Sequence, residues 1–380
     1  MSELGMLTLN IKNRNGIARR RQRGVTLVEL MVAMLLGLVL VAGIIQIFTG
    51  NRATYEFTDS LGRIQENARF TLDHIARDTR MAGFRGCLAD VAVFNNLDVP
   101  SLFRDDIENG VRGHDANGTG AGETFAATAK DPAPSGTPGN WTPALPAELN
   151  NLVIPGSDVL IVRSISGPTQ TMLAPFSTAA GVLVPNTHDY LPGEILVATD
   201  CQKASIFQLT TVTPAGPLDL LGHNANAAYT PGNATTLWAA DQLYGLGGEV
   251  ARLQTHAFYI GRGSNNRPSL FQLRLQWQNA TTSGFVPEEL VAGIDTMQLR
   301  YGLDTDNSGA PNSWVSGDAV GDWSDVLSTE ITLLARADDE YGTETDTGTY
   351  TLIDTQFNPV DDRRLRQVFS TSVGLRNRLP

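Results

Sequence analysis

The sequence Arg23-Gly24-Val25-Thr26-Leu27-Val28-Glu29-Leu30 opens the segment that decides the fold of the N-terminal part of the chain. Sixteen residues, 30–45, then follow without a polar side chain, and the apolar character continues to Phe48. A helix needs about 20 apolar residues to cross the roughly 30 Å hydrocarbon core of a bilayer. We therefore predict a transmembrane helix over residues 25–48.

The formal charge changes sign at this segment. Residues 1–24 carry six basic side chains against Glu3, a charge of +5, whereas residues 25–380 carry 22 basic and 39 acidic side chains, a charge of −17. Basic residues beside a membrane helix stay on the cytoplasmic side. We expect the N-terminus in the cytoplasm and the acidic remainder on the other side of the membrane. Such an acidic body is a poor general ligand for nucleic acid or anionic lipid.

The apolar segment is expected to remain in the mature protein. Residues 46–51 offer no small-residue site for signal peptidase, and no cysteine follows at which a lipid anchor could be attached. One interpretation is a simple signal anchor that holds an unrelated extracytoplasmic domain, such as an adhesin or a hydrolase.

Glu29 favours a more specific role for the helix. An acid at the centre of a bilayer costs about 2.5–3.5 kcal/mol on insertion scales, and less toward the interface, so a cationic partner is expected. A cut between Gly24 and Val25 would create an α-ammonium four residues before Glu29. A neighbouring subunit, displaced along the helix axis, could then present its ammonium to this carboxylate and set the axial register.

These residues resemble the class III signal of type IV prepilins and of type II secretion pseudopilins. In that family a dedicated aspartyl peptidase cuts after the glycine and methylates the new N-terminus. The resemblance implies that Gly24 is the cleavage residue, Val25 the methylated terminus and Glu29 the acid at the fifth mature position. The family usually has Phe at the first mature position, so Val25 departs from its pattern.

The helix is predicted to continue beyond the membrane. Apolar side chains recur every three or four residues on one face, and no proline occurs before Pro100, so one helix over about residues 25–82 is expected, with Gly83 as its end. The second half needs a partner surface for its apolar stripe. The alternatives are a coiled-coil stalk and, as in the resembling family, a β-sheet of the head. The apolar positions are Phe57, Leu61, Ile64, Ala68, Leu72 and Ile75.

The remainder is predicted to be a β-rich head, residues 84–380. Residues 90–151 are rich in Gly, Pro, Asn and Ala and are expected to form a long surface loop. Alternating apolar and polar positions predict half-buried antiparallel strands at 271–277, 326–336 and 364–375. Residues 158–163 and 194–198 are expected to be more fully buried strands. The domains are then a leader (1–24), a helix (25–83) and a head, an α+β fold.

Three further stretches resemble the PilW family of minor pilins. They are Thr79–Cys87 at the end of the helix, Leu299–Asp306 in the middle and Arg364–Phe369 near the C-terminus. Each is short, but together they span most of the chain. The resemblance implies a structural subunit that helps to start pilus assembly, lies in a complex at the fibre tip and forms no bulk of the filament. Extra loop sequence is expected within 90–151 and 216–242.

The two cysteines, Cys87 and Cys201, are predicted to form one disulfide. Cys87 follows the helix and Cys201 follows a predicted strand, so the bond would join the helix end to the sheet, and an oxidising compartment suits it. In the chain-entropy model a closed loop of this length contributes about 4.7 kcal/mol. The alternative is two separate thiols.

Other patterns give weak or no support for chemistry. Asp304, Asp306 and Ser308 match the first half of a calcium loop, but Val315 occupies the position of the bidentate Glu, so a plain turn is the favoured interpretation. The five histidines have no metal-ligand spacing, and no catalytic or cofactor motif is present, so we predict neither an enzyme nor a cofactor. The arginines of residues 363–378 are expected on the solvated face of an edge strand or against an acidic partner subunit, and contact with DNA or phosphate is the less favoured alternative.

The leading hypothesis is a minor pilin of a type IV pilus. Its expected partners are other minor and major pilins, the prepilin peptidase, the inner-membrane assembly platform and a tip adhesin, and its expected final location is the pilus at the cell surface. A minor pseudopilin of a type II secretion system is the alternative within the same architecture. The signal-anchored adhesin or hydrolase is the alternative from another class.

Overall fold

The computed structural model describes residues 24–86, 91–173, 181–341 and 344–378. The chain divides into two compact units, residues 1–56 and 57–380. A single helix, α1 (Leu27–Arg80), contributes to both units. The described part of the first unit is the start of α1 and the three residues before it.

The sequence of α1 explains its bounds. Thr26 precedes its first residue, no proline interrupts it, and basic residues occupy its last turn. Basic side chains near a helix C-terminus interact favourably with the exposed carbonyl groups. Gly83 follows the helix with φ +71°, a left-handed conformation that glycine adopts without a steric penalty. The observed helix lies within the range expected from the periodicity, residues 25–82.

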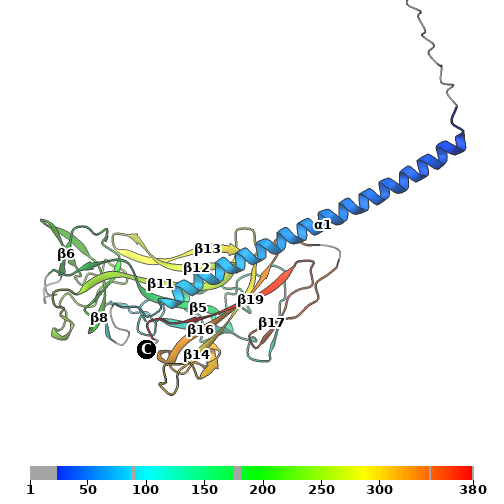
Figure 1. The fold of residues 1–380 in the computed structure, drawn as a ribbon. Coiled ribbons are helices and arrows are strands. Elements are labelled where there is room, and N and C mark those ends of the chain that lie inside the picture. The colour runs from blue at the N-terminus through cyan, green and yellow to red at the C-terminus, as the bar shows by residue number, and fades with distance from the viewer. Residues whose placement is uncertain (1–23, 87–90, 174–180, 342–343, 379–380) are drawn as a thin grey trace, which may run out of the picture. The chain divides into compact units, whose positions relative to one another are not determined.

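The larger sheet of the second unit has nine strands, most of them antiparallel. Its order is β1-β8-β7-β11-β5-β2-β4, and β12 pairs with both β11 and β13. Figure 1 shows β5, β11, β12 and β13 side by side. The strands are β1 (Ala92–Asn95), β2 (Val111–Ala116), β4 (Trp141–Thr142), β5 (Val159–Thr171), β7 (Ile195–Thr199), β8 (Lys203–Gln208), β11 (Glu249–Arg262), β12 (Pro268–Asn279) and β13 (Thr282–Ala292).

A second sheet has the order β15-β14-β16-β19. Its strands are β14 (Ile294–Leu303), β15 (Ser313–Val315), β16 (Val326–Arg336) and β19 (Arg366–Gly374). Two three-stranded sheets complete the head. They consist of β6 (Gly181–Pro185), β10 (Leu218–Gly222) and β9 (Thr211–Ala215), and of β17 (Tyr350–Leu352), β18 (Thr355–Asn358) and β3 (Thr124–Ala126).

Five short 3-10 helices lie between these strands in the described residues. They are η1 (Pro138–Asn140), η2 (Ala147–Leu149), η3 (Ala240–Gln242), η4 (Gly317–Ala319) and η5 (Trp323–Asp325). The predicted fold class, a long N-terminal helix on a β-rich antiparallel head, is confirmed.

The main core lies between the second half of α1 and the two large sheets. Ile64, Ala68 and Ile75 of α1 are at most 2% exposed, and they share one cluster with Phe258 of β11 and Met297 of β14. The helix stripe therefore packs on the head sheets, as in the alternative that the family resemblance implied, and not along a second helix.

The expected strands are present, but two of them are more deeply buried than their patterns indicate. In β16 every residue except Glu330 is buried, because the strand lies between β14 and β19 and is covered on both faces. In β12 the polar Gln272 is buried, since it meets polar groups of β11 and α1. A polar residue in an alternating pattern was thus no guide to solvent exposure at these positions.

The segment 90–151 differs from the expected surface loop. Its described residues, 91–151, contain β1 to β4, η1 and η2, and β2 pairs with β5 in the larger sheet. Trp141 and Leu149 are buried in a core cluster, and the indole Nε1 of Trp141 donates to the carbonyl of Ser157 at 2.9 Å. These strands are two to six residues long and depend on contacts distant in sequence, so local composition does not reveal them.

Candidate functional site

The first turn of α1 is closed by a reciprocal pair of hydrogen bonds between Thr26 and Glu29. The Glu29 carboxylate Oε2 accepts from the Thr26 backbone N–H and hydroxyl, each at 3.0 Å. In return, the Glu29 N–H donates to Thr26 Oγ1 at 3.2 Å. This is a capping box, which satisfies backbone donors that the helix itself leaves unpaired. This cap was not among the sequence predictions, although its Thr-x-x-Glu spacing is visible in the sequence.

The predicted cleavage position lies immediately before this box. Gly24 and Val25 are exposed and precede the helix, and Glu29 is exposed in its first turn. The bond between Gly24 and Val25 lies outside the helix and is exposed, so it is accessible to a peptidase. The structure thus brings Gly24, Val25 and Glu29 together within two turns of chain, next to the apolar segment.

The apolar half of α1 is long and apolar enough to cross a membrane. Its most apolar 18-residue window has a mean hydropathy of 2.7, and none of that window is buried in the structure. Large side chains such as Leu38 and Phe48 are about two-thirds or more exposed. This length and composition suit a bilayer or the packed helices of an assembly.

The second half of α1, residues 57–80, is here called the docked half, and polar contacts as well as its apolar stripe hold it to the head. The Asp78 carboxylate Oδ2 contacts the ring Nδ1 of His256 on β11 and accepts from Gln272 Nε2 on β12 at 3.3 Å. The Asn67 amide donates to the carbonyl of Ala292 at 3.3 Å. These contacts fix the rotation of α1 on the sheets. None of these contacts was predicted from the sequence, since they join residues about 180 to 225 positions apart.

The end of α1 packs tightly against the larger sheet. A Cβ added to Gly110 would lie 2.3 Å from the Gly83 N, so no other residue fits at position 110 without movement of the backbone. The Gly83 N–H donates to the carbonyl of Arg163 at 2.8 Å, and the Arg163 N–H donates to that of Gly110 at 2.7 Å. The helix end and β5 are therefore joined through backbone groups.

The predicted disulfide lies partly outside the described residues, because Cys87 is not among them. Cys201 lies two residues beyond Thr199, the end of β7. The neighbouring position, Gly86, is described, and a Cβ added there would lie 2.8 Å from Cγ2 of Thr199, the last residue of β7. The Cys87–Cys201 bond stays a prediction, and this close approach supports it.

The calcium candidate has the hydrogen bonds of a turn. The Asp304 carboxylate accepts from the backbone N–H groups of Ser308 at 2.9 Å and Gly309 at 2.8 Å, and Asp306 accepts from Ser308 at 3.2 Å. The carboxylates of the loop thus accept from its own backbone. Across the described ranges, no group of three or more His, Cys, Asp or Glu side chains is placed to hold a metal ion.

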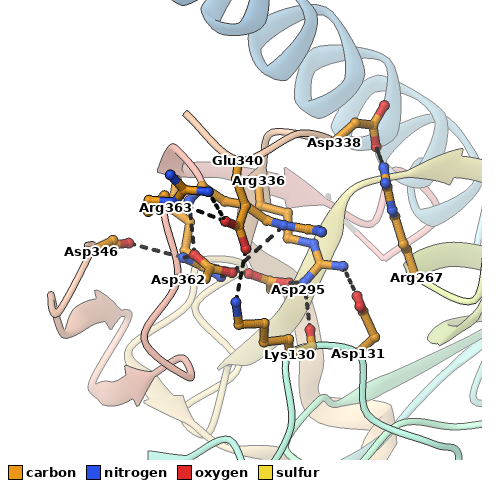
Figure 2. Close-up of polar contacts among 12 residues, drawn as sticks. Lys130, Asp131, Arg267, Asp295, Arg336, Asp338, Glu340, Asp346, Asp362 and Arg363 are labelled. Atoms are coloured by element: carbon orange, nitrogen blue, oxygen red, sulfur yellow. Dashed lines mark hydrogen bonds and ion pairs between the residues drawn. The ribbon is translucent and has the colours of Figure 1, made fainter. Parts of the chain in front are cut away.

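A buried network of ion pairs joins Asp131, from the early part of the head sequence, to the C-terminal strands β16 and β19 (Figure 2). Arg336 at the end of β16 contacts Asp131 and also Asp295, the latter at 3.1 Å. Arg366 at the start of β19 contacts Asp295 at 2.8 Å and Asp362 at 2.7 Å. Both arginine side chains are 1% exposed. The network holds residues of 90–151 against the C-terminal strands.

The expectation of a solvated basic cluster at 363–378 was wrong for three of its arginines, Arg364, Arg366 and Arg378, and the Arg364 side chain is only 10% exposed. Burial disfavours the charge of Arg366, but hydrogen bonds and charges of Asp362 and Asp295 outweigh this and raise its pKa. Arg378 donates to backbone carbonyl groups, among them that of Val326 at 3.0 Å. Arg376, by contrast, is exposed. Charge pattern alone did not distinguish arginines that neutralise distant buried acids from those that face solvent.

A pair of buried acids lies between β2 and β5. The carboxylate of Asp158 accepts from the backbone N–H groups of Ala116 at 2.9 Å and Leu299 at 2.8 Å. Burial raises the pKa of Asp158 well above its usual value, and nearby Asp115 raises it further. Burial and the charge of Asp318 also raise the pKa of Asp115, to about 7. The arrangement is structural, because the Asp158 carboxylate links β2 and β5 to β14.

Comparison with known families assigns the two ends of the chain. Residues 19–45 match the prokaryotic N-terminal methylation motif, and residues 257–377, about a third of the chain, match the family described as type IV pilus-assembly protein W, or PilW. The second match runs from within β11 to just beyond β19. No curated protein and no solved structure matches the chain.

The two family matches indicate a structural, membrane-anchored protein that interacts with pilus components and with the prepilin peptidase. The methylation motif opens the apolar helix and the PilW match covers the C-terminal sheets, and together these matches support the role of a PilW-type minor pilin in a type IV pilus.

Proposed function

We propose that the chain is made as a single-pass precursor of the inner membrane. Residues 1–24 remain in the cytoplasm, residues 25–48 span the bilayer, and the head lies in the periplasm. The positive charge of the leader and the negative charge of the remainder support this orientation. The exposed apolar half of α1 supplies the spanning segment.

The precursor is then cut between Gly24 and Val25, and the new N-terminus at Val25 is methylated. The observation that carries this proposal is the position of Gly24 and Val25 directly before a capped, uninterrupted apolar helix. In this arrangement the leader can be removed while the Thr26–Glu29 hydrogen bonds persist.

Glu29 guides the subunit into the assembly. Its Oε2 is engaged by Thr26, whereas no hydrogen bond to Oε1 is found within the described residues. The free oxygen can accept from the α-ammonium of Val25 in a neighbouring pilin, which would neutralise both charges inside the apolar helix bundle.

The assembled subunit takes part in starting the pilus and lies in a complex at its tip, together with other minor pilins, the first major pilins and a tip adhesin. The inner-membrane platform and the prepilin peptidase are its partners before assembly. The match to the PilW family supports this placement. The polar contacts of the docked half fix the rotation of the head about α1. A subunit that starts a helical fibre needs such a fixed orientation.

Processing at Gly24 tests the proposal. Gly24→Leu places a branched side chain at the cleavage position, so the protein should accumulate in the inner membrane with residues 1–24 attached. Edman sequencing and intact mass of the membrane-purified chain measure this. Gly16→Leu, also within the leader, is the matched control and should be processed normally. Normal processing of Gly24→Leu would overturn the proposed cleavage site.

A further inference from the structure

Strand β19 is the outer strand of the second sheet. It pairs with β16 from Arg366 to Gly374 without a shift in register, and no strand pairs with its other side in the part of the chain that the structure describes. Nine regular residues make it a long edge strand. An edge of this kind presents unpaired backbone N–H and C=O groups that can pair with another chain.

The hydrogen-bond pattern identifies the residues that face outward. The Ala337 N–H donates to the Leu365 carbonyl and the Leu375 N–H donates to the Leu327 carbonyl, each at 2.8 Å. Because backbone groups of an antiparallel strand alternate in direction, odd-numbered residues of β19 face β16 and even-numbered residues face outward. In agreement, the N–H of Arg376 faces away from β16 and donates to the Arg80 carbonyl at 3.1 Å.

The outward edge is open near Ser370 and Ser372, whose side chains are both exposed. Within the described residues, the backbone groups of these two serines have no hydrogen-bond partner on the outward side. The two ends of the edge are occupied. Arg366 is held by Asp362 and Asp346, and the carbonyl of Arg80 at the end of α1 caps the other end.

Other edge strands in the described head carry features that prevent pairing, and β19 has none of them. β13 contains Pro287 followed by two glutamates, and its register against β12 shifts twice. β9 contains Pro214, and the carbonyl of Leu183 in β6 accepts from Leu173. The remaining outer strands, β1, β4, β15, β17 and β3, are two to four residues long. Proline, charge, bulges and shortness are the usual protections of an edge, so the unprotected β19 stands apart.

The charges beside the open edge indicate the chemistry of a partner. Arg80 and Arg376 are exposed where α1 meets the end of β19, and neither forms an ion pair within the described residues. A carboxylate on the partner would neutralise this site. Small or polar side chains would fit beside Ser370 and Ser372, because cross-strand neighbours lie only about 5 Å apart.

We infer that β19 receives an extended segment of a different pilin subunit, which adds a strand at Ser370 and Ser372 and carries a carboxylate toward Arg80 and Arg376. Backbone pairing supplies the affinity, and the acid fixes the direction of the added strand. This inference rests on the proposed function, because assembly is what brings another pilin head next to this one.

A photo-crosslink in cells that produce the full chain tests the inference. A photo-reactive benzoylphenylalanine replaces Ser372, and mass spectrometry identifies the crosslinked peptide. We expect a peptide from the head of another pilin. The crosslink should fall about tenfold or more in Ser370→Pro, which removes an outward N–H and leaves the pairing with β16 intact. Ser370→Ala keeps the backbone donor and should retain the crosslink.

Two further variants separate loss of pairing from loss of fold. Thr371→Pro removes an N–H that faces β16 and should destabilise the head, whereas Ser370→Lys leaves the backbone unchanged and places a charge on the edge. If Ser370→Pro is degraded in cells, Ser370→Lys decides. The inference is overturned if the crosslink forms to a second copy of this chain, forms to a protein that is not a pilin, or does not form at all. It is also overturned if the crosslink persists in both edge variants, Ser370→Pro and Ser370→Lys.

Leader cleavage is measured in the same cells. An uncleaved chain signals failure of the proposed function, and a cleaved chain without a crosslink signals failure of this inference alone.

Discussion

The acids Asp115 and Asp158 make the stability of the head depend on pH. The pKa of Asp115 in the folded chain, about 7, lies above its ordinary value of 3.8, so the folded state binds the proton more tightly than the unfolded state does. The contribution of Asp115 to the free energy of unfolding is therefore greatest at acid pH, falls as pH rises from about 4 to about 7, and is constant above that. Asp158, whose pKa is also raised, acts in the same direction.

Asp115→Asn should remove one part of this dependence. The variant should gain stability relative to the natural chain by about 1–2 kcal/mol more at pH 8 than at pH 5, because Asn carries no charge to bury. Chemical denaturation of the detergent-solubilised chain at both pH values measures the difference. Asp73→Asn is the control, since the Asp73 side chain is 72% exposed. An equal effect of Asp115→Asn at the two pH values would contradict the assignment.

At the scale of single residues, the sequence is most informative at the N-terminus, because Gly24, Val25 and Glu29 lie within one short motif, and the matched methylation motif covers them. Their roles in cleavage, methylation and assembly stay predictions. The role of Asp78 could not, since its partner His256 is 178 residues away and no local pattern links them. The same reason explains Arg366, whose counter-ion Asp295 is 71 residues away.

Among the elements, the end of α1 and the end of β7 are the pair that a disulfide would join. The full-length chain, purified from its native membrane, should gain two alkyl groups more when it is alkylated after reduction than when it is alkylated without reductant. Intact mass spectrometry measures this directly. The approach of Gly86 to Thr199 is the structural reason to expect it. Equal masses under the two conditions would show that Cys87 and Cys201 are not bonded.

The regular elements were predictable where their pattern is long. Fifty-four residues of helix and strands such as β12 and β16 give periodicities that are visible without a structure. The strands inside 90–151 were not predictable, because each is short and is stabilised by burial against distant elements such as β5. The burial of β16 likewise depends on its two neighbouring strands, β14 and β19, and not on its own alternating pattern of apolar and polar residues.

At the scale of the whole molecule, the proposed role of Glu29 allows membrane anchoring and assembly to be tested separately. Glu29→Ala should leave the chain in the membrane and allow leader cleavage, because the apolar segment and Gly24 are unchanged. It should reduce the number of pili per cell strongly, since the ammonium of a neighbouring pilin loses its partner. Electron microscopy counts of pili measure this. Glu66→Ala, an exposed glutamate of the docked half of α1, is the control and should be neutral. Unchanged piliation in Glu29→Ala would contradict the role of the acid.

The capping box has one more consequence, for the timing of maturation. Because Thr26 and Glu29 close the helix by themselves, loss of residues 1–24 would remove side chains with a formal charge of +5, move the α-ammonium to Val25 and alter no backbone hydrogen bond of α1. Cleavage by the peptidase would then change the charge at the N-terminus irreversibly, while the conformation of α1 would stay the same. Newly cut subunits would need no refolding time, and the supply of assembly-competent chains would follow peptidase activity alone.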